Sequence, residues 1–222
     1  LSCICCGACG VDSRWAEMPV GPLILASASP RRRELLAQLG VECICKPADI
    51  DETPYADESP DAYVRRMALE KASAARRRHP GKAQWVLAAD TTVVADGAVL
   101  GKPRDREDAL RMLALLSGRA HIVMTAVCLR GAREESTVLV KTRVQFIPLT
   151  RHQCEAYLES GEAWDKAGAY GIQGLAGAFV AGIDGSYSNV VGLPLSETWQ
   201  LLRDQGIPTA LSPKASPEAF DE

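Results

Sequence analysis

The chain has 222 residues, of which 47% are hydrophobic and 24% charged, which is an ordinary composition for a globular protein. Its formal net charge of -3 argues against a general nucleic-acid-binding surface, and no apolar run approaches the roughly 18 residues that a membrane-spanning helix needs. We therefore expect neither a nucleic-acid partner nor a membrane, and the length suits one domain or two small lobes.

The N-terminus is unusual because four of the eight cysteines crowd into it, at Cys3, Cys5, Cys6 and Cys9. Thiols this close leave little room for a tetrahedral zinc site without a distant ligand. The chain begins with Leu1, and Met18 stands shortly before the first predicted strand. We therefore predict a non-native or disordered extension at 1–20, a single domain at 21–207 and a disordered tail at 208–222. The other cysteines are scattered, which suits a reducing cytoplasm.

The first predicted elements are a short buried strand at 23–25 and a helix that begins at Ser29-Pro30 and ends near Gly40. Its first turn carries Arg31, Arg32 and Arg33, although the helix dipole favours acids there by about 0.3 to 1 kcal/mol each. Free backbone N–H groups and guanidinium groups at one helix end form a site for phosphate or another anion. A solvated basic face is the alternative interpretation of these residues.

The middle of the chain alternates between strand and helix patterns. It first predicts a strand at 41–45, a polar connection containing Glu52 and a helix at 60–78. A buried strand follows at 85–89, ended by Asp90, with an extended continuation to 95. A hairpin at Asp96-Gly97 then leads to a strand at 98–100, a turn with Lys102 and a helix at 105–116. Lys71 interrupts the apolar stripe of the helix at 60–78. The alternative interpretation is a surface lysine that lays its aliphatic stem along the apolar face and keeps its ammonium group in water.

The second half predicts two long strands, a glycine-rich segment and a last helix. The strands lie at 121–129 and 136–146, Thr150 and Gln153 form a capping box for a helix to about 160, and Ser196 caps the last helix, which ends near 205. Glycine recurs from Gly161 to Gly185, which predicts close backbone approaches and turns with positive φ.

The candidate acids are Glu52 and Asp90, and the candidate cations are Arg31, Arg32, Lys71 and Lys102. Each stands beside a predicted strand end, where ligands of open α/β sheets usually bind. An aspartate that ends a buried strand is, taken alone, more often a turn or cap residue than a catalyst.

Several motifs in one order resemble the Maf family of nucleotide pyrophosphatases, and in particular its dTTP/UTP branch. They are SASPRRRELLAQLG, AADTTVV, GKP, LSGRAHIVMTAV, WDKAGAYGIQG and GSYSNVVGLPL, and the resemblance spans about 23–206. It implies a single α/β fold with a long mixed β-sheet flanked by helices and two lobes around a deep cleft. It also implies a homodimer that cleaves a nucleoside triphosphate to the monophosphate and pyrophosphate with a divalent metal cation, Mg²⁺ or Mn²⁺.

The resemblance also implies a role for each matching position. Asp90 matches the proton acceptor, and Glu52 and Asp90 match the metal-holding acids. The substrate-binding positions are Ser29, Arg31 and Arg32 in the phosphate-binding turn, the cleft lysines Lys71 and Lys102, and, together with Arg31, the positions Thr91 and Gln173 associated with substrate choice.

Gln173 gives a physical reason for the choice of base. A side-chain amide pairs with the donor and acceptor edge that uracil and thymine share, and a flipped amide fits cytosine. We therefore expect dTTP and UTP as substrates, CTP as a weaker one and modified uridine triphosphates as further candidates, in a house-cleaning role linked to cell division arrest. Two alternatives are a non-catalytic nucleotide-binding regulator of cell division and a 7-methyl-GTP pyrophosphatase, which Gln173 opposes.

Overall fold

The computed structural model describes residues 22–80 and 85–213. The extension predicted at 1–20 lies outside the described residues, as does most of the predicted tail. The start of that tail packs on the domain, because the backbone N–H of Ala210 donates to the carbonyl oxygen of Leu39 at 2.8 Å. The predicted boundary after residue 207 is therefore too early. In the two described ranges, no helix is both long enough and apolar enough to cross a bilayer.

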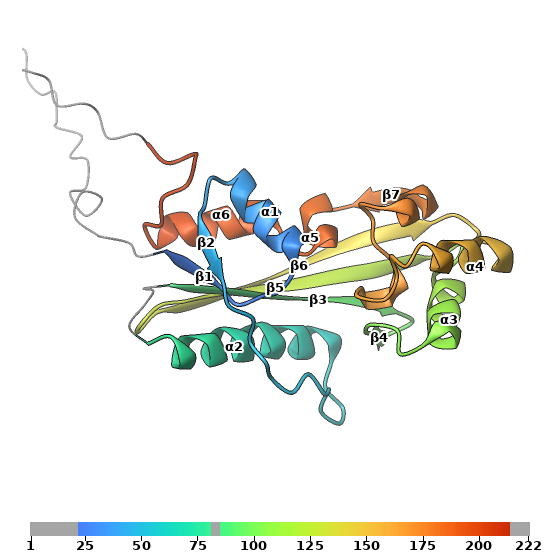
Figure 1. Ribbon diagram of the computed structural model, residues 1–222, viewed down its shortest axis with the longest axis horizontal. Helices are drawn as coiled ribbons and strands as arrows, with labels where there is room; N and C mark the ends of the chain where they lie inside the picture. The colour runs from blue at the N-terminus through green and yellow to red at the C-terminus, as the bar shows by residue number, and fades with distance from the viewer. Residues whose placement is uncertain (1–21, 81–84, 214–222) are drawn as a thin grey trace, which may run out of the picture.

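A mixed sheet forms the centre of the protein, with seven strands in the described part of the chain (Figure 1). Their order is β2-β1-β3-β5-β6-β7, and β4 pairs with β3 beside this row. The strands are β1 (Leu23–Leu25), β2 (Cys43–Cys45), β3 (Val86–Ala95), β4 (Ala98–Leu100), β5 (Ala120–Arg130), β6 (Glu135–Phe146) and β7 (Val180–Asp184). β1 runs parallel to β2 and β3. β3 is antiparallel to β4 and β5, and β6 is antiparallel to β5 and β7. The predicted long mixed sheet is confirmed.

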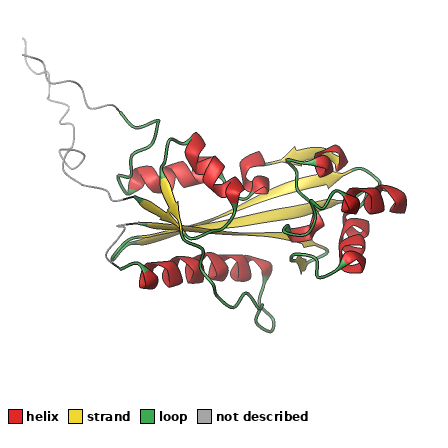
Figure 2. Cartoon of the chain, in the orientation of Figure 1, coloured by secondary structure: helices red, strands yellow, loops and turns green. Residues whose placement is uncertain are grey.

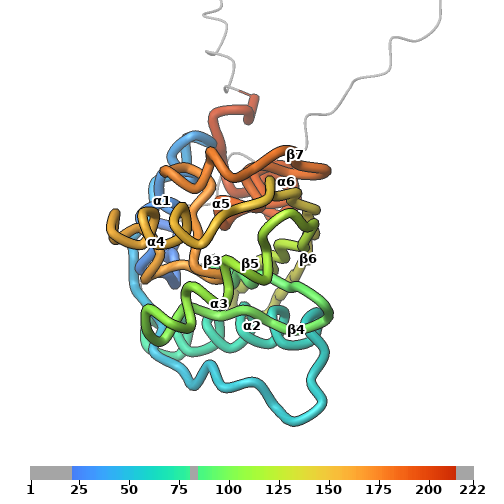
Figure 3. The backbone as a smooth tube through the Cα atoms, turned by 90° about the vertical axis from the view of Figure 1, so that its right-hand side faces the viewer, coloured from blue at the N-terminus to red at the C-terminus, as the bar shows by residue number. Residues whose placement is uncertain are grey.

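Helices cover both faces of this sheet (Figure 2). They are α1 (Pro30–Gln38), α2 (Pro60–Arg78), α3 (Arg106–Leu116), α4 (Arg151–Glu159), α5 (Tyr187–Val191) and α6 (Leu195–Asp204), with the 3-10 turns η2 (Ala167–Ala169) and η3 (Leu175–Phe179). In Figure 3, α2 lies on one side of the sheet, and α1, α5 and α6 lie on the other. We call β1, β2, α1, α2 and α6 the first lobe, and β4, α3, α4, η2, η3 and β7 the second lobe. The long strands β3, β5 and β6 join them.

Hydrophobic clusters on the two sheet faces hold the first lobe together. On the α2 face the contacts come largely from small side chains, which let the helix approach the sheet closely: Ala68, Ala72, Ala75, Ala88 and Ala126. On the other face leucines of α1 and α6 pack on leucines of the strands: Leu25, Leu35, Leu36, Leu87 and Leu202. Each fully buried leucine stabilises the fold by about 1.5 to 3 kcal/mol.

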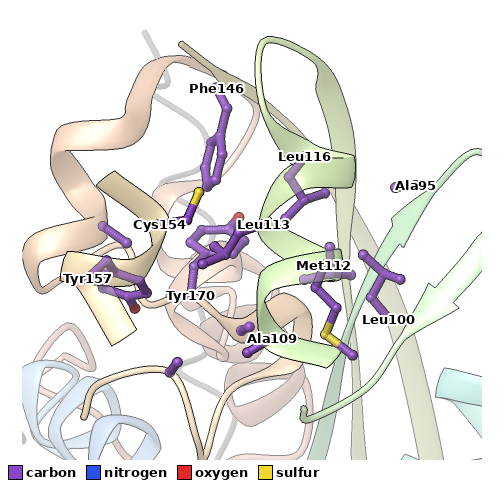
Figure 4. Packing of buried hydrophobic residues seen from close by; sticks show 14 of the residues in the cluster. Ala95, Leu100, Ala109, Met112, Leu113, Leu116, Phe146, Cys154, Tyr157 and Tyr170 are labelled. Atoms are coloured by element: carbon purple, nitrogen blue, oxygen red, sulfur yellow. The ribbon is translucent and has the colours of Figure 1, made fainter. Parts of the chain in front are cut away.

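The second lobe has its own core between α3, α4 and the ends of the long strands. Leu113 and Leu116 of α3 are fully buried, and they belong to one cluster with Phe146, Tyr157 and Tyr170 (Figure 4). Because each lobe has a separate core, the space between the lobes is left open for a cleft.

The edge of β3 between the lobes is the feature that positions the site. One edge of β3 pairs with β5 from Val86 to Val94. On the other edge β1 pairs only with the start of the strand, at Val86 and Leu87, and β4 only with its end, from Val93 to Ala95. Among the described strands, none pairs with residues 88–92 on this edge. Asp90 lies in that gap, in the middle of β3. Because the strand continues to Ala95, the prediction that Asp90 ends a buried strand is wrong.

Two other local predictions differ from the structure. Residues 180–184 form an edge strand, β7, that the glycine-rich pattern did not predict. The last helix begins at Leu195 with Pro194 in the N-cap position, so Ser196 lies inside the helix and does not cap it. Both differences arise where nearby Gly and Pro residues obscure the local pattern.

Candidate active site

All the residues predicted for the site line one cleft of about 960 Å³ between the two lobes. They are Ser29, Arg31, Arg32, Glu52, Lys71, Asp90, Thr91, Lys102 and Gln173. Because alternate residues of a strand face opposite sides of the sheet, Asp90 and Thr91 of β3 point to different faces. The cleft therefore draws residues from both faces at the unpaired edge of β3.

On the α2 face, a lysine joins the two acids. The Nζ atom of Lys71 lies 2.6 Å from Oε1 of Glu52 and 2.7 Å from Oδ1 of Asp90. Asp90 is only 8% exposed, so its charge has little contact with water. The ammonium group offsets the repulsion between the two carboxylates, which is the physical reason for a lysine in an otherwise apolar helix stripe.

The loop that carries Glu52 is fastened to α2. The hydroxyl of Tyr63 donates to the carbonyl oxygen of Glu52 at 3.0 Å, and the guanidinium of Arg66 donates to the carbonyl oxygen of Thr53 at 3.0 Å. Burial, followed by the charges of Asp90 and Glu52, raises the pKa of Tyr63 to about 12. The phenol is therefore neutral near pH 7 and donates its proton to the loop.

Burial and cations act in opposite directions on Glu52. Burial raises the pKa of Glu52, but the hydrogen bond and charge of Lys71, with the charges of Lys102 and Arg32, outweigh it and hold the pKa below its usual value. The cleft thus favours an ionised carboxylate at this position. An ionised carboxylate can bind a divalent cation or accept a proton.

On the opposite face, the guanidinium group of Arg32 is held at three points. Its Nε donates to the carbonyl oxygen of Gly192 at 2.9 Å, and its two terminal nitrogens donate to Oγ of Ser27 at 3.2 Å and to Oγ1 of Thr91 at 3.0 Å. Burial lowers the pKa of Arg32, and the charge of Asp90 opposes this effect. The side chain is therefore a fixed cation at the floor of the cleft.

The first turn of α1 leaves its N-terminal groups available to a ligand. Ser29 occupies the N-cap position, but its hydroxyl makes no capping hydrogen bond to the helix. Arg31 reaches across the cleft and forms an ion pair of 3.5 Å with Asp165 of the second lobe. This pair is long and partly exposed, so it holds Arg31 weakly and a phosphate group could replace it.

The wall formed by the second lobe presents Gln173 on a tightly packed loop. A Cβ atom at Gly174 would lie 2.0 Å from a carboxylate oxygen of Glu162, and one at Gly171 would lie 2.5 Å from the side chain of Lys166. The same carboxylate of Glu162 accepts from the backbone N–H of Leu175 at 3.0 Å. The predicted close backbone approaches are confirmed, and they fix the loop around Gln173.

The residues fit a divalent cation that is shared with a substrate. Among the described residues, no group of three or more His, Cys, Asp or Glu side chains is arranged to hold a metal by itself. Glu52 and Asp90 supply two carboxylates, and Mg²⁺ is commonly held by one or two carboxylates together with substrate phosphates and water. The donor set therefore suits a hard cation that arrives with a polyphosphate.

Several residues of the cleft were not predicted from the sequence. Ser27, Tyr63, Glu162, Asp165 and Lys166 all line it. Ser27 stands in the SASP motif, and the last three stand in the glycine-rich segment, so their position beside predicted site residues was the available signal. Tyr63 is one of the polar residues of a long helix and carried no signal of its own.

Comparison with known proteins places the chain in a family. A family model described as "Maf-like protein" matches residues 22–205. A Myxococcus xanthus protein named "dTTP/UTP pyrophosphatase" is 58% identical over 186 residues, which cover 84% of this chain and 93% of the relative. A protein of the same name from Anaeromyxobacter sp. is 55% identical over 191 residues, covering 84% of this chain and 90% of the relative. A solved Mycobacterium abscessus nucleoside-triphosphatase / dITP/XTP pyrophosphatase is 18% identical, covers 64% of this chain and 96% of its own, and has a TM-score of 0.39. The chain belongs to the Maf family.

Proposed function

We propose that this protein is a nucleoside triphosphate pyrophosphatase that hydrolyses dTTP and UTP to the nucleoside monophosphate and pyrophosphate. The observation that carries the proposal is the meeting of an acidic pair, Glu52 and Asp90, with the half-buried cation Arg32 in one cleft. Relatives at more than half identity carry the name dTTP/UTP pyrophosphatase, which supports the same activity.

The first turn of α1 would receive the polyphosphate. Its backbone N–H groups, the hydroxyl of Ser29 and the guanidinium groups of Arg31 and Arg32 match the anionic oxygens. Lys102, on the facing wall, adds a further cation. Fixed cations of this kind stabilise the charge that develops on the phosphoryl oxygens in the transition state.

Asp90 would act as the general base. A water molecule attacks the α-phosphorus, the bond between that phosphorus and the oxygen leading to the β-phosphorus breaks, and Asp90 accepts the water proton while pyrophosphate leaves. Lys71 holds Asp90 and Glu52 in place through its contacts of 2.7 and 2.6 Å. Mg²⁺ or Mn²⁺ held by Glu52 and Asp90 would lower the pKa of a bound water and offset phosphate charge.

Gln173 would select the base. Its amide offers a donor and an acceptor to uracil or thymine, and the packing of Glu162 and Lys166 on its loop limits its movement. A guanine base presents two adjacent donors, which a carboxylate suits better than an amide. This supports dTTP and UTP over 7-methyl-GTP, with CTP as a weaker substrate through a flipped amide.

A substrate panel tests this function. UTP, dTTP, CTP, GTP and 7-methyl-GTP are incubated with the protein and Mg²⁺ or Mn²⁺, and the products are separated by chromatography. We expect UMP or dTMP with pyrophosphate in equal amounts, slower turnover of CTP, and the least turnover of the two guanine nucleotides. Release of orthophosphate and a diphosphate, or faster turnover of CTP than of UTP, would contradict the proposal.

The homodimer expected from the family resemblance and the cytoplasmic location expected from the scattered cysteines stay predictions. Sedimentation of the purified protein tests the first, and fractionation of the native cells tests the second.

A further inference from the structure

Thr125 of β5 is fully buried and lies outside the cleft lining, yet its hydroxyl belongs to a chain of hydrogen bonds that ends at the phosphate-binding arginine. The Oγ1 atoms of Thr125 and Thr91 are 2.9 Å apart, and Thr91 in turn accepts from Arg32 at 3.0 Å. On its other side, Thr125 donates to the carbonyl oxygen of Asn189 at 3.0 Å. The two threonines are directly opposite each other in the pairing of β3 with β5.

The direction of this chain follows from the donors that are present. A threonine hydroxyl carries a single proton. Thr125 uses its proton on the carbonyl oxygen of Asn189, so the hydrogen bond between the two threonines must be donated by Thr91. The hydroxyl proton of Thr91 is thus already used, and its oxygen accepts from Arg32. Thr91 has no proton left to donate to a nucleotide base.

The short helix α5 supplies both acceptors at the end of this network. The carbonyl oxygen of Asn189 in α5 accepts the hydrogen bond from Thr125. The carbonyl oxygen of Gly192, directly after α5, accepts from Nε of Arg32 at 2.9 Å. The amide of Asn189 fixes the helix by donating to the carbonyl oxygen of Val123 at 3.0 Å and to Oγ1 of Thr142 at 2.9 Å. This gives a physical role to the GSYSNVVG motif, which has no other part in the proposed chemistry.

We propose that Thr125 is a positioning residue for Arg32, acting through Thr91, and so serves phosphate binding from outside the cleft. The proposal rests on the proposed function. It is compatible with the family resemblance, which associates the position of Thr91 with substrate choice, because the oxygen of Thr91 can still accept a hydrogen bond. A guanidinium group held by oriented acceptors is already in place when the polyphosphate arrives, so less conformational entropy is lost on binding.

Five variants test the proposal: Thr125→Val, Thr91→Val, the double variant that combines these two, Thr125→Ser and Thr198→Val. Valine has the shape of threonine without the hydroxyl, and serine restores the hydroxyl. Thr198 is the matched control, since it is fully buried in α6, its hydroxyl has no hydrogen-bond partner in the described structure, and it lies outside the cleft. For each variant, kcat and KM are measured with UTP and CTP, UTP binding is measured by calorimetry, and thermal unfolding reports stability.

We expect Thr125→Val and Thr91→Val each to lower kcat/KM for UTP roughly tenfold. Thr125→Val should lower it equally for CTP and leave the ratio between the two bases unchanged, because Thr125 lies outside the cleft. The double variant should have about the same kcat/KM as either single variant, because both substitutions break the same chain of hydrogen bonds. Thr125→Ser should restore activity, and Thr198→Val should match the parent protein.

Two results would overturn the proposal. One is a Thr125→Val protein whose UTP turnover and UTP binding match those of Thr198→Val. The other is a Thr125→Val protein that changes the ratio of UTP to CTP turnover, which would mean that Thr125 acts on the base and not through Arg32. If no nucleotide is hydrolysed, the proposed function fails, but the calorimetric comparison of UTP binding still decides the role of Thr125.

Discussion

His121 is a buried titratable residue that the proposed chemistry does not use. It is 2% exposed, and its Nε2 atom lies 2.8 Å from the hydroxyl of Tyr170, which lines the cleft. The rings of Phe146 and Tyr170 contact it edge-on, with centroids 5.0 and 5.4 Å away. Burial in this aromatic cluster lowers the pKa of His121 to about 4, from an ordinary value of 6.5.

This pKa predicts a loss of stability in mild acid. Between pH 6.5 and pH 4 the unfolded chain binds a proton at His121 and the folded protein does not, so the free energy of unfolding falls as the pH falls. From pH 7 to pH 5 the loss at this residue is about 2 kcal/mol. Urea unfolding at both pH values should show that His121→Gln removes this part of the loss, whereas the exposed control His152→Gln keeps it. A His121→Gln protein with an unchanged pH dependence would contradict the assignment.

At the level of single residues, the sequence predicted the members of the cleft better than their contacts. Glu52, Lys71 and Asp90 were candidates because each stands beside a predicted strand end, where ligands of open α/β sheets usually bind. Thr125 was not, because threonine is common in strands, and only the pairing of β3 with β5 places its hydroxyl against Thr91.

The loop between β2 and α2 carries Glu52, one of the two acids proposed to hold a metal, and Arg66 holds this loop. The guanidinium donates to both carboxylate oxygens of Glu58 at 2.7 Å and stacks 3.8 Å from the ring centroid of Tyr55. With its bond to the carbonyl oxygen of Thr53, Arg66 ties both ends of the segment that follows Glu52 to one helix. Lysine cannot make such a forked contact.

Arg66→Lys should therefore loosen the loop. We expect faster hydrogen–deuterium exchange across residues 47–58, weaker binding of Mn²⁺ in the presence of UTP, and a roughly tenfold fall in kcat/KM. Arg65→Lys is the control, because Arg65 is its exposed neighbour on the same helix. Equal exchange rates in the two variants would show that Arg66 does not fix the loop.

Elements with strong local signals were predicted correctly. The hairpin at Asp96-Gly97 has positive φ at both residues, and the capping box of Thr150 and Gln153 has both of its hydrogen bonds. The position of β3 was predicted, but its continuity through Asp90 and the edge strand β7 were not. Both depend on pairing with β5 and β6, which are distant in the sequence.

At the scale of the whole molecule, the cleft exists because β1 and β4 pair with different parts of one edge of β3. This arrangement leaves Asp90 and Thr91 between two separately packed lobes. Neither periodicity nor composition predicts such a gap, since both report on one segment at a time. The resemblance to the Maf family did imply two lobes and a cleft, and the lobe cores and the cleft agree with it.

The measurement that tests the central claim most directly is the release of pyrophosphate from UTP by the parent protein and by Asp90→Asn, with UTP binding measured on both. Asparagine keeps the shape of the side chain but accepts protons poorly. We predict a fall in kcat of about 100-fold to 10,000-fold, with UTP binding unchanged within a few fold. An Asp90→Asn protein that still releases pyrophosphate at nearly the parent rate would contradict the account of Asp90 as the base.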